Sequence, residues 1–299
     1  MATLAPGRRS PLGAPLSGRR ADRMRSSTRS RRSAIPGFGL TLGVTLLALC
    51  LIVLIPLAAV VARSAGMGPA AFAHAAFSAR AVHAYILSFS AALIGASVNA
   101  VFGLLTAWVL VRYSFPGRAI LNALVDLPFA LPTSVAGVAL AGLYASNGWI
   151  GGLLAPLGIK AAYNEVGVVI ALTFVGLPFV VRTIEPVLRD LAVDVEEAAA
   201  SLGAGRLQTL ARVIGPALLP AWITGFALAF ARAVGEYGSV IFIAGNMPYK
   251  TEIAPLLITI ELEQFDYASA SAIATVMLAV AFLMLFVING AQAWSRRFG

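Results

Sequence analysis

Residues 267–295 read YASASAIATVMLAVAFLMLFVINGAQAWS, a run with no charged side chain from Tyr267 to Ser295. A helix needs about 20 mostly apolar residues to cross the hydrocarbon core of a bilayer, and this run is long enough. Inside that core every backbone polar group must be paired, which a helix achieves within its own segment. The run therefore predicts a transmembrane helix and makes this chain a membrane protein.

Five further stretches satisfy the same requirement. The third is interrupted only by Asp126, and the fifth carries Arg232 and Glu236 in its second half. Together with the last run they predict an all-α membrane protein of about six transmembrane helices. In chain order the five stretches are Ser33 to Ala62, Ala81 to Val111, Ala119 to Tyr144, Val166 to Val181, and one that starts near Gly215.

The composition excludes a soluble enzyme. Hydrophobic residues make up 59% and charged residues 12% of the 299-residue chain, against roughly 45–50% and about 25% in a soluble domain. The mean hydropathy of +0.87 also excludes a disordered chain, which needs low hydrophobicity and high charge. In a soluble protein the net charge of +9 would suggest nucleic acid as a partner, so the positions of the charges are informative.

The positive charge is concentrated in residues 1–33, which hold nine arginines and a single acidic residue, Asp22. This segment is rich in Ser, Pro and Gly and has no apolar periodicity, so we expect a disordered basic arm. The rest of the chain holds 13 basic and 12 acidic residues. We therefore expect a nearly neutral membrane body, with lipid rather than nucleic acid as its surroundings.

The first apolar stretch has one alternative interpretation, a secretory signal peptide, because Arg31 and Arg32 precede it and small residues follow. Its apolar part exceeds the 7–15 residues of a signal peptide, and five more spans follow. We expect a retained helix.

The distribution of basic residues predicts the orientation. If the amino terminus is cytoplasmic, 17 basic residues fall in inside segments and only four in outside loops. Cytoplasmic loops carry an excess of Lys and Arg, so both termini are expected inside the cell. The long segment from Arg182 to Pro216 is then a cytoplasmic loop.

No nucleotide site or catalytic constellation is recognisable in the sequence. A Walker loop has Gly directly before Lys, whereas Ile159 precedes Lys160 and Tyr249 precedes Lys250. No zinc-protease histidine pair and no Gly-x-Ser-x-Gly elbow occur. The chain is predicted not to be an enzyme and to bind no cofactor or metal of its own.

The most informative cytoplasmic stretch is DVEEAAASLGAGR, from Asp194 to Arg206. Glu197 to Leu202 predicts a short helix with a face of small residues, which Gly203 can end in a left-handed conformation. Gly215-Pro216 is expected to break the chain before the fifth span. A small-residue face allows another protein to approach closely, while an ordinary loop on the membrane surface is the alternative.

The spacing in this stretch resembles the EAA loop of ABC importer permeases: Glu-Ala-Ala, three residues, Gly, nine residues, Ile-x-Leu-Pro. Here the matching positions are Glu197, Ala198, Ala199, Gly203 and Pro216, with Val213 in place of Ile and Gly215 in place of Leu. In that family the loop is a coupling helix seated in a cleft of the ATPase subunit. The resemblance implies that role for these residues.

Other segments resemble the T subunits of sulfate/thiosulfate permeases, from about Ile35 to Asn289. The resemblance implies a type I ABC importer permease with a W-type second permease, two copies of a cytoplasmic ABC ATPase that holds ATP and Mg²⁺, and a periplasmic sulfate/thiosulfate-binding protein. It also implies the bacterial inner membrane. The segments are Arg112–Arg118, Asp126–Gly137, Pro178–Thr183, Gly235–Asn246 and Gln264–Ala274.

With this resemblance the chain divides into four parts: the basic arm 1–33, a first helix and outer loop 34–80, a permease domain 81–290, and a cytoplasmic end 291–299. The coupling loop occupies about residues 185–216.

Arg232 and Glu236 are four residues apart, and on a helix they would lie one above the other. A charge at bilayer depth costs at least about 2.5–3.5 kcal/mol, so it should face protein or a water-filled cavity. Either the two form a structural ion pair, or Arg232 lines the path of an oxyanion while Glu236 restrains it. Gly235 and Gly238 would leave room for close helix approach.

Pro128 and Pro132 predict a kinked or broken third span, because each removes a helix hydrogen bond. Thr133 and Ser134 would either donate to sulfate oxygens there or satisfy the freed carbonyls. Asp126 would serve structure or gating, paired with an arginine of the second permease or placed near the inner interface. We include Asp126, Pro132, Thr133 and Ser134 in the candidate pathway.

Importing a dianion into a cell that is negative inside costs about 5 kcal/mol per 100 mV. An external ATPase supplies this energy more simply than a symporter, for which the spans offer few acidic residues. A self-contained secondary anion transporter is the main alternative, and a membrane-embedded enzyme is a second one.

Overall fold

The structure is a computed structural model that describes residues 38–191 and 193–295, with side chains described over 38–191 and 194–290. The basic arm and the last four residues lie outside this range. Six helical stretches within it are long and apolar enough to cross a membrane, and no strand occurs in it, which confirms the all-α class. The six are Phe38–Ala65, Ala79–Arg112, Thr133–Leu157, Glu165–Asp190, Arg206–Val234 and Tyr267–Gly290.

The chain divides into two units, Met1–Leu54 and Ile55–Gly299. The described part of the first unit consists of α1 (Phe38–Leu49) and a π-helical segment, Cys50–Leu54. Its side chains are exposed, as expected for an apolar helix that meets lipid.

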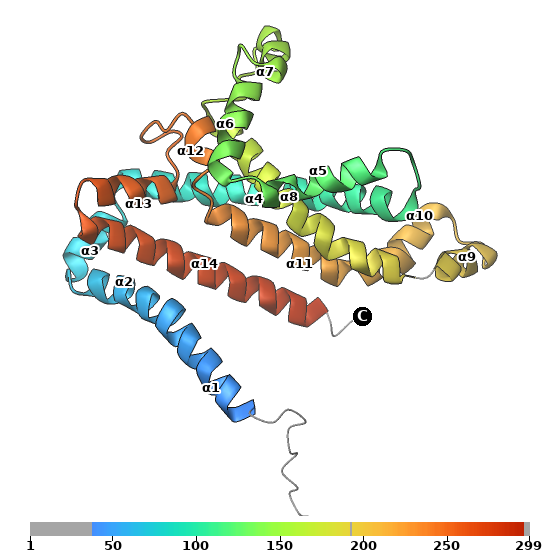
Figure 1. Cartoon of the computed structure of the whole chain (residues 1–299), viewed down its shortest axis with the longest axis horizontal. Helices are drawn as coiled ribbons and strands as arrows, with labels where there is room; N and C mark the ends of the chain where they lie inside the picture. Colours follow the sequence, from blue (N-terminus) through green and yellow to red (C-terminus); the bar gives the residue numbers. More distant parts are fainter. Residues whose placement is uncertain (1–37, 192, 296–299) are drawn as a thin grey trace, which may run out of the picture. The chain divides into compact units, whose positions relative to one another are not determined.

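The second unit is built on four long helices, α4 (Ala79–Arg112), α8 (Glu165–Asp190), α11 (Gly215–Val234) and α14 (Tyr267–Ser295) (Figure 1). The shorter helices are α2 (Ile55–Ala65), α3 (Pro69–Ala76), α5 (Arg118–Ala130), α6 (Thr133–Tyr144), α7 (Trp149–Leu154), α9 (Val193–Ser201), α10 (Arg206–Thr209), α12 (Val240–Ile243) and α13 (Ala254–Glu263).

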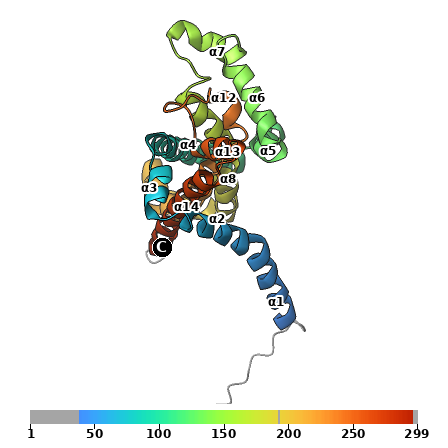
Figure 2. The ribbon, with the colours of Figure 1, turned by 90° about the vertical axis from the view of Figure 1, so that its left-hand side faces the viewer.

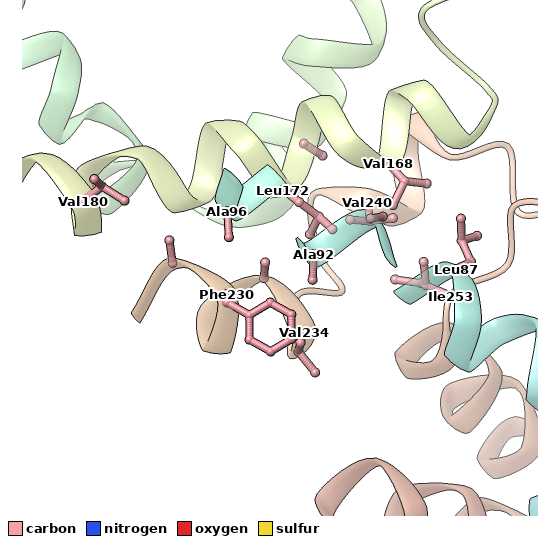
Figure 3. Packing of buried hydrophobic residues seen from close by; sticks show 14 of the residues in the cluster. Leu87, Ala92, Ala96, Val168, Leu172, Val180, Phe230, Val234, Val240 and Ile253 are labelled. Atoms are coloured by element: carbon pink, nitrogen blue, oxygen red, sulfur yellow. The ribbon is translucent and has the colours of Figure 1, made fainter. Parts of the chain in front are cut away.

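The core lies where α4, α8 and α11 pack against one another (Figure 3). Ala96, Leu172 and Phe230 are buried there, one from each helix. Small residues bring the backbones close, as is usual for helices packed in membranes. At Gly103 a Cβ atom would lie 2.7 Å from Cγ1 of Val180, so only glycine permits this approach of α4 to α8.

The third apolar stretch, Ala119 to Tyr144, is broken into two helices, as Pro132 predicts, whereas Pro128 lies inside α5. α5 ends at Ala130, Leu131 is extended at φ −84° and ψ 137°, and α6 begins at Thr133. Pro132 causes the break, because the residue before a proline is pushed out of the helical region. From this point α6 and α7 project away from α4, α8 and α11 (Figures 1 and 2).

The fourth span is longer than the stretch Val166 to Val181, because α8 continues to Asp190. The charged residues that suggested a loop, Arg182, Glu185 and Arg189, pair with one another along α8. Such pairs offset the cost of charge near the membrane. The loop between the fourth and fifth spans therefore begins after Asp190 rather than at Arg182.

Gly215-Pro216 does not break the chain, contrary to expectation. A π-helical turn, Leu210–Ile214, joins α10 to α11, and the Gly215 N–H donates to the Leu210 carbonyl. This wider turn changes the carbonyl positions next to Pro216 and so accommodates the proline ring within a continuous helix.

Candidate functional site

The helix α9 carries the Glu-Ala-Ala sequence and ends at Ser201, just before the turn that contains Gly203. That glycine has φ +83°, the left-handed conformation that closes a helix. The N–H of Ala204 donates to the Ala199 carbonyl at 3.0 Å, which satisfies one of the last carbonyls of α9. The local fold predicted for this stretch is confirmed.

One face of α9 is held against the rest of the chain and another is exposed. Glu196 binds Arg112, at the end of α4, with 2.5 Å between Oε1 and Nη2. The same guanidinium donates to the Leu191 carbonyl at 3.3 Å. Glu197 and Ala198 are exposed, and Ala199 is buried. This ion pair was not predicted from the sequence, although the arginine at the end of the second span and the acidic residues of the loop were both visible there.

Arg232 and Glu236 form an ion pair, with 2.5 Å between Nη1 and Oε2. They do not share a helix, however, because α11 ends at Val234 and Glu236 lies in the break that follows. The Glu236 side chain is only 2% exposed, whereas that of Arg232 is 33% exposed. The pair is therefore buried on its acidic side and open on its basic side.

The second oxygen of Glu236 stabilises the start of α12. Its Oε1 accepts hydrogen bonds from both the N–H and the hydroxyl of Ser239, each at 2.9 Å. Buried carboxylates are tolerated when both oxygens are paired in this way. Glu236 thus has a structural role whether or not Arg232 meets an anion.

The break after α11 meets the break before α6. A Cβ atom on Gly238 would lie 2.2 Å from Oγ1 of Thr133, and one on Gly137 would lie 2.4 Å from the Ser239 carbonyl oxygen. Close approach at Gly238 agrees with the sequence prediction. Gly235 does not serve this purpose, because a Cβ atom there would meet nothing within 4 Å.

Thr133 and Ser134 form the first turn of α6 beside this junction. Neither hydroxyl makes a hydrogen bond to any residue that the structure describes. Pro132 and Ser134 are exposed, and Thr133 is half-buried. The junction therefore presents two hydroxyls and the first turn of a helix as candidate contacts for an oxyanion, while Arg232 lies in the last turn of α11 before the break.

Asp126 lies on the other side of the α5–α6 break and is bound by this chain's own Arg182. The guanidinium of Arg182 donates to both carboxylate oxygens, at 2.8 Å and 2.6 Å. It also donates to Oδ1 of Asn122 at 2.9 Å and pairs with Glu185. The sequence left open an arginine of the second permease or a place near the inner interface. The structure supplies Arg182 of the same chain, which was missed because Arg182 was assigned to a loop.

Comparison with known proteins finds one matching family and several similar permease proteins. The family described as "Binding-protein-dependent transport system inner membrane component" matches residues 99–298. The chain is 50% identical over 270 residues to the "Sulfate transport system permease protein CysT" of Salmonella typhimurium, covering 90% of this chain and 96% of the relative. The corresponding protein of Escherichia coli K12 is 49% identical with the same coverage. That of Synechocystis is 51% identical over 255 residues, covering 85% of this chain and 89% of the relative.

Solved structures share the fold. A chain of a bacterial ABC transporter involved in the import of alginate matches with a TM-score of 0.69 at 15% identity, over 87% of this chain and 94% of that chain. A chain of the MetNI methionine ABC transporter, in inward-facing conformations, matches with a TM-score of 0.53 at 16% identity, over 72% and 95%. At these identities the likeness concerns the fold alone.

Proposed function

This chain belongs to the family of binding-protein-dependent transport system inner membrane components, and from that premise we propose that it carries sulfate, and thiosulfate or a similar oxyanion, into the cell. The observation that carries the proposal is the sequence identity of about one half to three sulfate permeases over most of the chain. The junction between the start of α6 and the break after α11 supports it, since the hydroxyls of Thr133 and Ser134 there can donate to an oxyanion.

In this proposal the chain works as one subunit of an ATP-driven importer. The other subunits are a W-type second permease, two copies of a cytoplasmic ABC ATPase that binds ATP and Mg²⁺, and a periplasmic sulfate/thiosulfate-binding protein. The energetic reason is that moving a dianion inward costs about 5 kcal/mol per 100 mV of membrane potential. The exposed Glu197 and Ala198 of α9 provide the ATPase contact.

Coupling then acts through α9. Closure of the two ATPases draws the α9 helices of the two permeases together and opens the spans toward the outside. The Arg112–Glu196 pair transmits this motion to the end of α4, because it is a direct bond between the two helices. Release of ADP and phosphate returns the spans to the inward-facing state.

Uptake by the purified complex in vesicles tests the proposal. Vesicles that contain both permeases and the ATPase should accumulate radioactive sulfate only when ATP is enclosed with the ATPase and binding protein is present on the opposite side. Accumulation driven by a proton or sodium gradient, with this chain alone and no ATPase, would favour the self-contained secondary transporter instead.

A further inference from the structure

A cavity of about 910 Å³ lies where the end of α4 and the start of α11 meet the segment around α9 and α10. The excess of basic residues on the inner side puts these helix ends at the cytoplasmic surface of the membrane. Ligand pockets are typically about 300–1,000 Å³, so this cavity is large enough for a sizeable occupant. It is separate from the junction between the start of α6 and the break after α11, and it shares no residue with that junction.

The wall of the cavity has the composition of a membrane interface. It includes several leucines, of which Leu207 is 82% exposed. It also includes Trp108, Trp222 and Tyr113. Tryptophan and tyrosine are enriched where hydrocarbon meets lipid headgroups, because their rings are apolar and one edge is polar. An occupant of this cavity is therefore mainly apolar.

The wall of the cavity carries one positive charge that no acidic residue of the described chain neutralises. Two charged residues line it, Glu196 and Arg206. Glu196 is already neutralised by Arg112. Arg206 is exposed, and its side chain makes no ion pair or hydrogen bond with any residue in the described range. An apolar cavity with one uncompensated cation on the cytoplasmic side suits an acyl chain joined to an anionic headgroup.

We propose that this cavity binds an anionic phospholipid of the inner leaflet, with acyl chain against the leucines and phosphate on Arg206. Glu197 and Ala198, the proposed ATPase contact, do not line the cavity, so docking of the ATPase leaves the lipid in place. Glu196 and Ala200 of α9 do line it. The bound lipid therefore fills the space between α9 and the two spans and restricts the movement of α9.

Native mass spectrometry of the complete complex, exchanged into phosphatidylcholine and then titrated with phosphatidylglycerol, tests the proposal. We expect one tightly bound phosphatidylglycerol for each copy of this chain. Arg206→Gln should weaken that binding about fivefold, the factor for a basic residue worth about 1 kcal/mol at an anionic surface. Arg212→Gln is the matched control, because Arg212 is exposed on the same segment but does not line the cavity.

A second variant tests the apolar part of the site. Leu105 lines the wall, and Leu105→Trp should reduce phosphatidylglycerol binding while the melting temperature of the complex shows that it remains folded. Equal binding by the Arg206→Gln and Arg212→Gln complexes would overturn the proposal. Displacement of the bound lipid by inorganic phosphate alone would also overturn it, because that result assigns the site to a free anion.

Discussion

Arg182 of α8 binds Asp126 of α5 through two hydrogen bonds, 2.8 Å from Nε to Oδ1 and 2.6 Å from Nη2 to Oδ2. Asp126 precedes the helix break at Leu131, and its partner lies on one of the three core helices. The pair thus attaches α5 to the core a few residues before the chain turns into α6. It fixes one end of the break on which the candidate pathway depends.

The two residues of this pair should respond unequally to mutation. The Asp126 side chain is 47% exposed, so Asp126→Ala should cost about 1 kcal/mol or less. Arg182→Ala also removes one of the two ion-pair partners of Glu185, which is 8% exposed and keeps Arg189, and should cost about 2 kcal/mol, typical of lost hydrogen bonds to a charged group. Thermal unfolding of the purified complex measures both. Equal losses of stability in the two variants would show that Arg182 does not stabilise the buried Glu185 carboxylate.

Glu197→Arg should abolish the stimulation of ATP hydrolysis by the binding protein, because it reverses the charge of the exposed α9 face. The basal rate and the assembly of the complex are measured alongside. Glu165→Arg is the matched control, since Glu165 is exposed at the opposite, amino-terminal end of α8. Unchanged transport by the Glu197→Arg complex would refute the coupling role of α9.

Gly238→Ala should disrupt the junction between α6 and the break after α11, since the new Cβ would lie 2.2 Å from Oγ1 of Thr133. Overpacking of this kind costs about 1–3 kcal/mol and should lower both the melting temperature and the rate of sulfate uptake. Gly235→Ala meets no atom within 4 Å and serves as the control. Combining Gly238→Ala with Thr133→Ala should recover part of the stability.

Asn99 and Gly176 should be coupled in a double-mutant cycle. Asn99 is fully buried in the core, and neither polar atom of its side chain has a hydrogen-bond partner in the described structure. Gly176→Ala should destabilise the protein, because a Cβ there would lie 2.5 Å from Nδ2 of Asn99. In an Asn99→Ala background the same change should cost at least 1 kcal/mol less. Additive effects on the melting temperature would contradict this contact.

Asp266 should make a pH-dependent contribution to stability. Its carboxylate accepts hydrogen bonds from the N–H and the hydroxyl of Ser269, at 2.9 Å and 2.7 Å, and so caps α14. Those two bonds lower the pKa of Asp266 in the folded protein. The stabilisation is therefore complete above the unfolded-state pKa and is lost as the pH falls through the lower folded-state value.

Asp266→Ala measures this contribution. Near neutral pH the variant should melt below the wild type, by an amount that corresponds to about 1 kcal/mol for a lost helix cap. The difference should shrink in acid, where the wild-type carboxylate is protonated as well. A difference that stays constant down to the acid range would rule out the cap as its source.

Local sequence patterns correctly predicted those helices and helix ends that are determined by neighbouring residues. The charge-free run from Tyr267 to Ser295 is one helix with those bounds. Gly203 ends α9 because a left-handed residue closes a helix wherever the next N–H groups can reach back. The break before α6 was also visible, because Pro132 restricts Leu131 through covalent geometry alone.

Predictions failed where side-chain pairing or helix geometry offset a cost that the local sequence pattern indicated. Charged residues from Arg182 onward indicated a loop, but partners on α5 and α8 neutralise them and α8 continues to Asp190. Gly215-Pro216 indicated a break, but the preceding π-helical turn accommodates it. The ion pair of Arg232 and Glu236 was predicted correctly, although Glu236 lies beyond the helix end.

The sequence alone therefore determined the membrane class and the family resemblance, because hydrophobic length and motif spacing are both properties of a linear chain. Only the tertiary structure decided which charges meet. Arg182 and Asp126 are 56 positions apart, and Arg112 and Glu196 are 84 apart. The packing of α4, α5, α8 and α9 brings these partners within hydrogen-bonding distance. No local sequence pattern specifies that packing.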